Sequence, residues 1–332
     1  MLFLIMINDI NLGIDSSISL FADDTRISRS ISSEDCVEKM QEDLDKLYSW
    51  QKENNMKFNG TKFELIRYGG NKSIKENSIY FTPDYDNVID EKETLRDLGI
   101  ILSSDMKFSE HVEKIVATVN KKMGWILRTF RSRNIFMMKI LWKQLLQPHV
   151  DYCSQLYFQG QSMDLTKLEN LQRSYTKKIR EAQGLNYWDR LKVLGLNSQE
   201  RRIERYRIIY TWKCLEGLVP DCGISSKNNA RSGRHCEIEV INNKSSKRIQ
   251  TLKENSFTVN GPRLFNSLPN KLRNMTKCTV DEFKYQLDDF LKRIPDQPKT
   301  PGMEPEAMNQ YSAKPSNSVI DQVRRINIQS GE

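Results

Sequence analysis

The sequence predicts an α+β fold, with short β-hairpins and one helix in the N-terminal third of the 332-residue chain and mainly helices in the rest. Two observations support this prediction. Near the N-terminus, strand-like apolar runs alternate with turn residues, whereas from Ser109 onward apolar residues recur at the three- and four-residue spacing of helices. The chain is also long enough to hold more than one domain and to bury a core.

A predicted hairpin close to the N-terminus carries two adjacent aspartates, Asp23 and Asp24. They follow the apolar run 18–20 and precede the strand-like run 25–27. Side chains alternate faces along a strand, so two neighbouring carboxylates can reach one site only where the strand bends into a turn. Carboxylate oxygens suit Mg²⁺, and the corresponding chemistry is two-metal phosphoryl transfer. The alternative is a pair of acids on a solvated turn.

A helix and a second hairpin follow in the predicted order. After Ser33, the expected N-cap, apolar residues recur at helical spacing until about residue 55. Residues 56–66 then form two β-leaning runs joined by Asn59 and Gly60, which is a strong hairpin signal. An apolar strand over residues 98–102 precedes the next long helix.

That long helix is predicted to be amphipathic, from Ser109 as its N-cap to Phe130. Its apolar stripe consists of Val112, Ile115, Val119, Met123, Ile126 and Phe130. Basic side chains lie opposite or beside the stripe, at Lys114, Lys121, Lys122 and Arg128. These cations can face a phosphate backbone while the apolar stripe holds the helix to the core. Ordinary solvation of a helix face is the alternative.

The remainder of the chain is predicted to be helical, with a linker and a tail. Helices are expected over 135–147, ending at Pro148, and over 165–182 and 198–215. The last of these is expected to have a basic face, formed by Arg201, Arg202, Arg205 and Arg207. A linker over 221–250 and a small apolar-cored unit over 251–294 precede an expected disordered tail, 295–332.

The net charge of +8 is unevenly distributed. Residues 1–104 contain 12 Lys and Arg against 19 Asp and Glu, residues 105–213 contain 21 against 10, and residues 214–332 contain 18 against 14. Acid where metal ions would bind, and base where a nucleic-acid backbone would lie, is the polarity that a polymerase needs.

Cysteine use and hydropathy indicate a protein of the nucleus or cytoplasm that is not secreted. Six cysteines occur without a close Cys-x-x-Cys pair, which favours reduced thiols. A zinc site could be imagined from four residues, although their spacing fits no common zinc pattern: Cys214, Cys222, His235 and Cys236. No run reaches the roughly 18 apolar residues of a membrane span, and no membrane partner is expected. The oligomeric state is not indicated.

Several segments, taken in order, resemble the reverse transcriptases of non-LTR retrotransposons of the jockey-like branch. The run 21–24, Phe-Ala-Asp-Asp, looks like the catalytic hairpin of the palm, and the apolar opening 2–9 resembles the segment that leads to it. Trp50 and the run 59–62 resemble the next palm motif. Residues 98–100 resemble the primer-grip strand, and the helix from Ser109 resembles the thumb. Three later runs resemble the C-terminal region of these retrotransposon proteins: 168–173, 199–202 and 261–269.

The resemblance implies roles for individual residues in an RNA-directed DNA polymerase. Asp23 and Asp24 would hold Mg²⁺ at the primer 3′ end, Phe21 and Ala22 would pack near the terminal nucleotide, and Lys62 would act as the general acid for the pyrophosphate leaving group. The implied partners are an RNA template and a DNA primer, held as an RNA–DNA hybrid. The implied divisions are a partial palm over 1–104, a thumb over 105–150 and a helical C-terminal region over 151–220.

In that family the third metal-binding aspartate lies upstream of the apolar opening with which this chain begins. Asp9 matches a position where a turn or capping role is expected rather than a metal role. We therefore expect an N-terminally truncated remnant of the polymerase that does not extend a primer. The alternatives are a non-catalytic module whose basic helices bind a nucleic-acid duplex, and a helical interaction protein whose charges are solvated surface.

Overall fold

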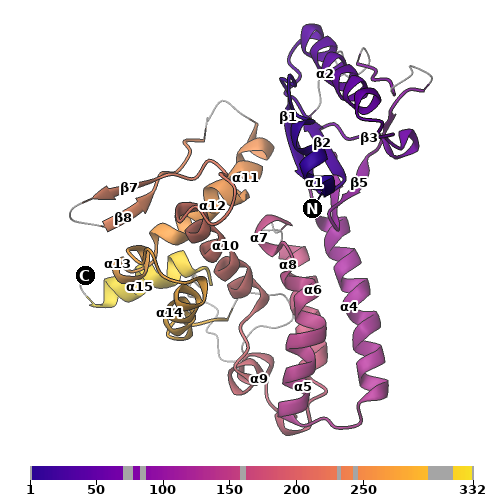
Figure 1. The fold of residues 1–332 in the computed structure, drawn as a ribbon. Helices are drawn as coiled ribbons and strands as arrows, with labels where there is room; N and C mark the ends of the chain where they lie inside the picture. The colour runs from indigo at the N-terminus through magenta and orange to yellow at the C-terminus, as the bar shows by residue number, and fades with distance from the viewer. Residues whose placement is uncertain are drawn as a thin grey trace. The chain divides into compact units, whose positions relative to one another are not determined.

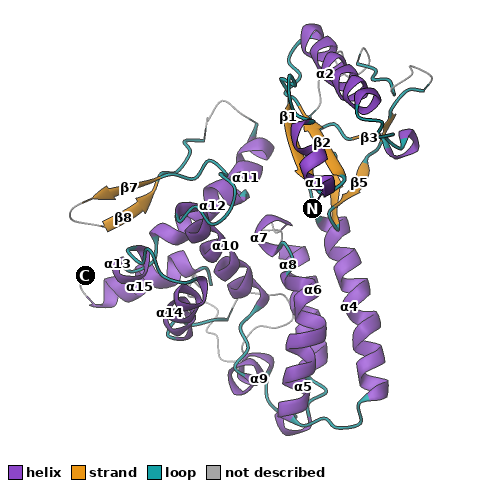
Figure 2. Ribbon diagram, in the orientation of Figure 1, coloured by secondary structure: helices purple, strands orange, loops and turns teal. Residues whose placement is uncertain are grey.

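The computed structural model describes residues 2–69, 78–82, 87–157, 162–229, 233–241, 246–297 and 317–330. The chain divides into two units, Met1–Met106 and Lys107–Glu332 (Figure 1). Helices prevail and the strands are short, as Figure 2 shows. The predicted mixture of helices and small sheets is therefore confirmed. The boundary between the two units lies between Met106 and Lys107.

The first unit combines one long helix with short strands. Its elements are α1 (Leu2–Met6), the 3-10 helix η1 (Ile7–Asp9), β1 (Ser17–Phe21), β2 (Asp24–Ser28), α2 (Glu34–Glu53), η2 (Gly60–Lys62), β3 (Glu64–Leu65), β4 (Asp90–Glu91), β5 (Thr94–Asp97) and β6 (Ile100–Ser103). Strand β1 pairs antiparallel with β2, and β5 with β6, whereas β3 and β4 are parallel.

The helix predicted after Ser33 is confirmed as α2. Acidic residues in its first turn complement the positive end of the helix dipole. The side chain of Ser33 makes no capping hydrogen bond and lies 3.3 Å from Cys36 Sγ instead. The apolar face of α2 packs against the N-terminal segment and forms the core of this unit, with buried members Ile7, Ile10, Met40, Leu44, Leu47, Tyr48 and Trp50.

The hairpin predicted over residues 56–66 is wrong, because residues 59–62 form a different turn. Asn59 Oδ1 accepts hydrogen bonds from the backbone N–H of Thr61 (3.2 Å) and from its hydroxyl (2.7 Å). Phe58, just before the turn, stacks on Trp50 of α2 with ring centroids 6.4 Å apart, and Phe63 packs at its edge. Side-chain capping and aromatic burial on α2 therefore prevail over the Asn-Gly hairpin preference.

The strand predicted over 98–102 is shorter than expected. Leu98 and Gly99 form the turn between β5 and β6, with φ values of 44° and 89°. Asp97 pairs with Ile100 across this turn, so the strand begins at Ile100. Positive φ at both central residues is the geometry of a tight two-residue hairpin loop.

The second unit is mainly helical. Its elements are α4 (Ser109–Thr129), α5 (Ile135–Leu141), the π-helical segment η3 (Trp142–Leu146), α6 (Gln147–Asp151), α7 (Ser154–Tyr157), α8 (Ser162–Thr176), η4 (Arg180–Ala182), α9 (Tyr187–Leu194), α10 (Gln199–Leu215), β7 (Ser226–Asn229), β8 (Gly233–Cys236), α11 (Lys247–Asn255), α12 (Phe257–Asn266), α13 (Asn270–Arg273), α14 (Val280–Lys292) and α15 (Val319–Ser330).

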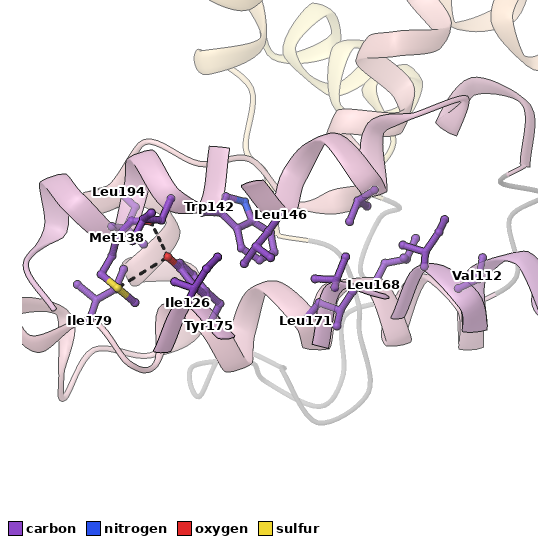
Figure 3. Close-up of a cluster of buried hydrophobic side chains, with 14 of the residues drawn as sticks. Val112, Ile126, Met138, Trp142, Leu146, Leu168, Leu171, Tyr175, Ile179 and Leu194 are labelled. Carbon is purple, nitrogen blue, oxygen red and sulfur yellow. Dashed lines mark hydrogen bonds between the residues drawn. The ribbon is translucent and has the colours of Figure 1, made fainter. Parts of the chain in front are cut away.

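One apolar core of this unit joins α4 to α5, α6 and α8 (Figure 3). The predicted stripe of α4 is confirmed, since Val119 and Ile126 are fully buried and Met123 packs against the same core. Tyr175 Oη donates a hydrogen bond to the backbone carbonyl of Met138 at 2.9 Å. Ser109 is the first helical residue rather than the cap, and its hydroxyl donates to Asp164 at 2.8 Å.

The helix predicted to stop at Pro148 continues past it. Proline has no N–H to donate and its ring clashes with the preceding turn of an α-helix. Here the preceding segment widens into a π-helix, in which the N–H of Gln147 donates to the carbonyl of Trp142. The wider turn accommodates Pro148 at the start of α6, so the chain stays helical to Asp151.

A second apolar core joins α10 to α12, α14, β8 and α15. Gly261 of α12 lies against α10, where an added Cβ would be 2.5 Å from the hydroxyl oxygen of Thr211. A larger residue there would push the two helices apart. Residues 261–269 therefore include a glycine at a helix crossing and the buried side chains of Leu264 and Phe265.

The expected linker over 221–250 contains ordered structure. Strands β7 and β8 pair antiparallel, and Asn266 of α12 brackets Cys236 by accepting from its N–H (2.7 Å) and donating to its carbonyl (2.9 Å). Part of the expected disordered tail, residues 319–330, forms helix α15. Its Val319 is fully buried in the second core. Residues 298–316 of that tail lie outside the described residues.

Candidate nucleic-acid interface and aspartate hairpin

The two aspartates lie at the tip of the β1–β2 hairpin. Phe21 pairs with Asp24, so Ala22 and Asp23 form a two-residue loop. Ala22 has a φ of 54°, a left-handed conformation that is unfavourable for residues with a Cβ. All four side chains are exposed, Phe21 to 65%. The hairpin therefore presents neighbouring carboxylates on a strained and accessible loop.

A buried carboxylate, Asp43 of α2, fixes the base of this hairpin. It accepts hydrogen bonds from the N–H (2.9 Å) and hydroxyl (2.7 Å) of Ser16, which precedes β1, and from Arg29 Nη2 (2.9 Å), which follows β2. The N–H of Asp15 (3.2 Å) and Lys46 Nζ (3.0 Å) also donate. Burial disfavours the charged carboxylate, but the donors outweigh it and hold the pKa of Asp43 well below its usual range.

Sequence reasoning missed Asp43, although a signal was present. Asp43 lies three residues after Met40 and four before Leu47, so it interrupts the apolar stripe of α2. An acid on a buried helix face is rare unless it is paired. Its partners could not be predicted, because Ser16 and Arg29 lie 27 and 14 residues away along the chain.

Asp23 and Asp24 alone do not fit a two-metal site. Such a site needs carboxylates that converge from more than one segment on two ions about 4 Å apart. In the ranges that the structure describes, no three His, Cys, Asp or Glu side chains gather in a group that could hold a metal ion. This loop by itself therefore supports no metal-dependent step.

Two other residues of the predicted palm lie apart from the aspartate loop. Asp9 accepts a hydrogen bond from Trp50 Nε1 at 2.9 Å, which joins η1 to α2. This contact agrees with the structural role expected for Asp9. Lys62 ends η2 with its side chain exposed, and within the described residues no contact joins it to either aspartate. Its action as a general acid stays a prediction.

The exposed face of α4 carries the basic residues predicted to contact a phosphate backbone. The four side chains are exposed, and none forms an ion pair within the part of the chain described, namely Lys114, Lys121, Lys122 and Arg128. Near the N-terminus of α4, Glu113 forms an ion pair with Lys167 at 2.9 Å. Residues 114–150 contain eight Lys and Arg and no Asp or Glu. No neighbouring acid in that run offsets the positive charge.

The arginines of α10 do not form the predicted basic face. Arg201 is fully buried, and the other three lie against protein groups of the second unit. The partners, in chain order, are the carbonyls of Pro295 and Asn317 for Arg201, Asp151 for Arg202, Asp288 for Arg205, and Asn260 with the carbonyls of Gln155 and Asn255 for Arg207. The prediction of a basic face on α10 is therefore wrong. On α4, by contrast, the basic side chains are exposed as predicted.

Helices α8 and α10 meet in a buried polar network. Glu169 of α8 is fully buried and accepts hydrogen bonds from Tyr187 Oη and from the N–H of Gln199 at 2.9 Å. Gln199 Nε2 in turn donates to Gln172 Oε1. Burial raises the pKa of Glu169 to about 8 in spite of its two donors. Residues 168–173 and 199–202 therefore contribute a shared internal contact to the fold.

The cysteine and histidine residues considered for zinc do not assemble as a metal site. Cys214 and Cys222 have sulfurs 2.6 Å apart, and burial raises the pKa of Cys214 to about 12. His235 lies beside Arg273, with Nε2 2.5 Å from Nη1, and Cys236 is buried in the second apolar core. Among the described residues, these four are not part of any group of His, Cys, Asp or Glu side chains that could hold a metal ion.

Comparison with known proteins adds no family assignment. The sequence matches no protein-family model, and neither the curated proteins nor the solved structures include a match. Over the described residues, no helix combines the length and apolar character required to cross a membrane. The case for function therefore rests on the sequence segments and on the geometry of the chain itself.

Proposed function

We propose that this chain binds nucleic-acid duplexes through the exposed basic face of α4. The observation that carries the proposal is the charge of that face. Lys114, Lys121 and Arg128 project opposite the buried stripe and belong to the acid-free run 114–150. Lysine and arginine on one helix face can neutralise successive phosphates, and the resulting release of counterions drives binding without dependence on base sequence.

We also propose that the chain derives from a non-LTR retrotransposon reverse transcriptase. The order of its elements supports this origin: an aspartate-tipped hairpin, the long helix α2, the β5–β6 hairpin and then α4. In this assignment the first unit contains palm elements, the long helix belongs to the thumb, and the ligand is an RNA–DNA hybrid. Mg²⁺ would be the metal ion of the parent reaction.

The proposed activity of this chain is binding without primer extension. Asp23 and Asp24 are adjacent at one loop, and polymerase chemistry needs further carboxylates from another segment. A primer–template assay with Mg²⁺ or Mn²⁺ should therefore show no extension. Extension that disappears in Asp23→Ala would contradict this half of the proposal and would identify the loop as a working metal site.

The binding proposal is tested by fluorescence anisotropy with a labelled RNA–DNA hybrid at several salt concentrations. Each phosphate contact contributes roughly 0.9 to the slope of log affinity against log salt on B-form duplex, so Lys121→Ala/Lys122→Ala should reduce that slope by about 1 to 2. The loss should be similar for hybrids of different sequence. Affinity should fall because two cations are removed, while the helix remains held by its buried stripe.

A matched control removes two exposed lysines from another surface of the same unit. Lys271 on α13 and Lys292 on α14 are both exposed, and Lys271→Ala/Lys292→Ala makes the same change in net charge. This variant should keep the wild-type slope. If the two double variants change the slope equally, or if neither changes it, the α4 lysines are ordinary solvated surface and the interaction-protein alternative is favoured.

A further inference from the structure

The basic face of α4 also carries an exposed aromatic ring. Trp125 is 52% exposed, whereas the other four tryptophans of the chain are 9% exposed or less. It follows Lys121 by four residues and precedes Arg128 by three, and Lys114 lies seven residues before Lys121. At 3.6 residues per turn these spacings place the four side chains in one stripe along the helix. The stripe lies opposite the buried face that contains Val119 and Ile126.

The indole of Trp125 contacts an aromatic ring at the end of α4. Phe130 meets Trp125 in an edge-to-face contact, with ring centroids 6.3 Å apart and an interplanar angle of 88°. Phe130 itself packs against the first core of the unit. Burial of a large aromatic side chain is strongly favourable, so a tryptophan that stays half exposed leaves apolar area available to a ligand.

We propose that Trp125 is a stacking platform for an unpaired nucleotide base whose flanking phosphates contact Lys121 and Arg128. The inference rests on the proposed duplex binding and adds a single-stranded segment of RNA or DNA to the ligands of this face. Aromatic rings among cations are the arrangement that binds single strands, because every base has a stacking face and every phosphate a charge. In paired duplex the bases are stacked on one another, so the ring has no free base to contact.

The first test uses the intrinsic fluorescence of the full chain. Titration with single-stranded oligothymidylate should quench tryptophan emission in the wild type, because the exposed indole stacks on a base. Trp125→Phe should bind the same oligonucleotide with little quenching, since the remaining tryptophans are buried. Equal quenching in the wild type and Trp125→Phe would place the responding indole elsewhere and overturn the proposal.

The second test separates stacking from charge. Trp125→Ala should weaken binding of oligothymidylate by about 5- to 150-fold, the range for loss of one base–aromatic stack, and should leave the salt slope unchanged. Binding of a blunt RNA–DNA hybrid should change little. Tyr285 on the acidic helix α14 is 71% exposed, so Tyr285→Ala is the matched control and should bind like the wild type.

The outcomes distinguish this proposal from the one on which it rests. If Lys121→Ala/Lys122→Ala lowers the salt slope but Trp125→Ala binds oligothymidylate normally, the stacking site is refuted and the backbone-binding function stands. If the wild type binds neither probe, both are refuted. If Trp125→Ala changes only self-association, measured by sedimentation, the ring belongs to a protein interface and the stacking proposal fails. Circular dichroism establishes that the variants are folded.

Discussion

Replacing Asp43 with Asn should release the aspartate hairpin from α2. In the folded unit this carboxylate accepts five hydrogen bonds, two of them from cations, and 1% of its side chain is exposed. Asn keeps the shape of the side chain but offers one acceptor oxygen and no charge. Ser16 and Arg29, on either side of the hairpin, would therefore lose acceptors.

The expected loss follows from the burial of the partners. Breaking a buried ion pair by removing one member costs about 3–5 kcal/mol. The side chains of Arg29 and Lys46 are 16% and 42% exposed, so water can recover part of their solvation. We therefore expect a loss near the lower limit, about 3 kcal/mol, which corresponds to a roughly 150-fold increase in hairpin opening.

Hydrogen exchange followed by mass spectrometry measures this opening directly. Amides of residues 16–28 should exchange about two orders of magnitude faster in Asp43→Asn than in the wild type, because local opening is less costly. Glu42→Gln is the matched control, since Glu42 is the exposed neighbour of Asp43 on α2. Equal protection in Asp43→Asn and the wild type, or equal losses of protection in both variants, would refute the role of Asp43 in fixing the base of the hairpin.

The same carboxylate predicts a dependence of stability on pH. Because the folded-state pKa of Asp43 is depressed, its contribution is complete above the ordinary Asp pKa of about 3.9 and is lost as the pH falls toward the folded-state pKa. Urea unfolding of the wild type should therefore show declining stability below about pH 4, with a smaller decline in Asp43→Asn. Parallel declines in the two proteins would contradict this assignment.

Two further substitutions test other features of the fold. Ala22→Gly should stabilise the β1–β2 hairpin by up to about 1 kcal/mol, since glycine tolerates the φ of 54°. Amide exchange in the hairpin should therefore become slower. Faster exchange would show that the loop is not strained. Burial raises the pKa of Glu169 to about 8, so the folded chain keeps a proton that the unfolded chain releases near pH 4.3. Stability to urea should therefore fall as the pH rises from about 5 to 8, and Glu169→Gln should flatten this profile; an unaltered profile would exclude Glu169 as its source.

Local patterns in the sequence were sufficient for the long helices. The stripes of α2 and α4 recur at helical spacing, and their burial follows from that spacing alone. The aspartate hairpin was also predictable, because the strand-like runs 18–20 and 25–27 lie on both sides of it. The structure places the two-residue turn at residues 22 and 23, so Asp24 begins β2. The exposure of Lys121 and Lys122 also agrees with the pattern, since both lie off the apolar stripe.

Long-range contacts decided the features that were predicted wrongly. Arg201, Arg202 and Arg205 of α10 have the spacing of one helix face, yet Arg205 reaches Asp288 on α14, 83 residues away. The expected tail forms α15 because Glu204 accepts hydrogen bonds from the N–H of Val319 (3.0 Å) and the hydroxyl of Ser318 (2.6 Å). These pairings, Arg205 with Asp288 and Glu204 with Ser318 and Val319, join residues too far apart in sequence to be predicted from local patterns.

The sequence by itself determined where apolar faces form, because a helix or strand repeats on the scale of a few residues. Only the tertiary structure decided the fate of individual charges. Asp43 and Arg207 became buried and bonded, whereas Lys121 remained exposed, although all three are charged residues on helices. The physical reason is that a charge is buried only when distant donors or acceptors replace its lost water, and their positions depend on how the helices pack.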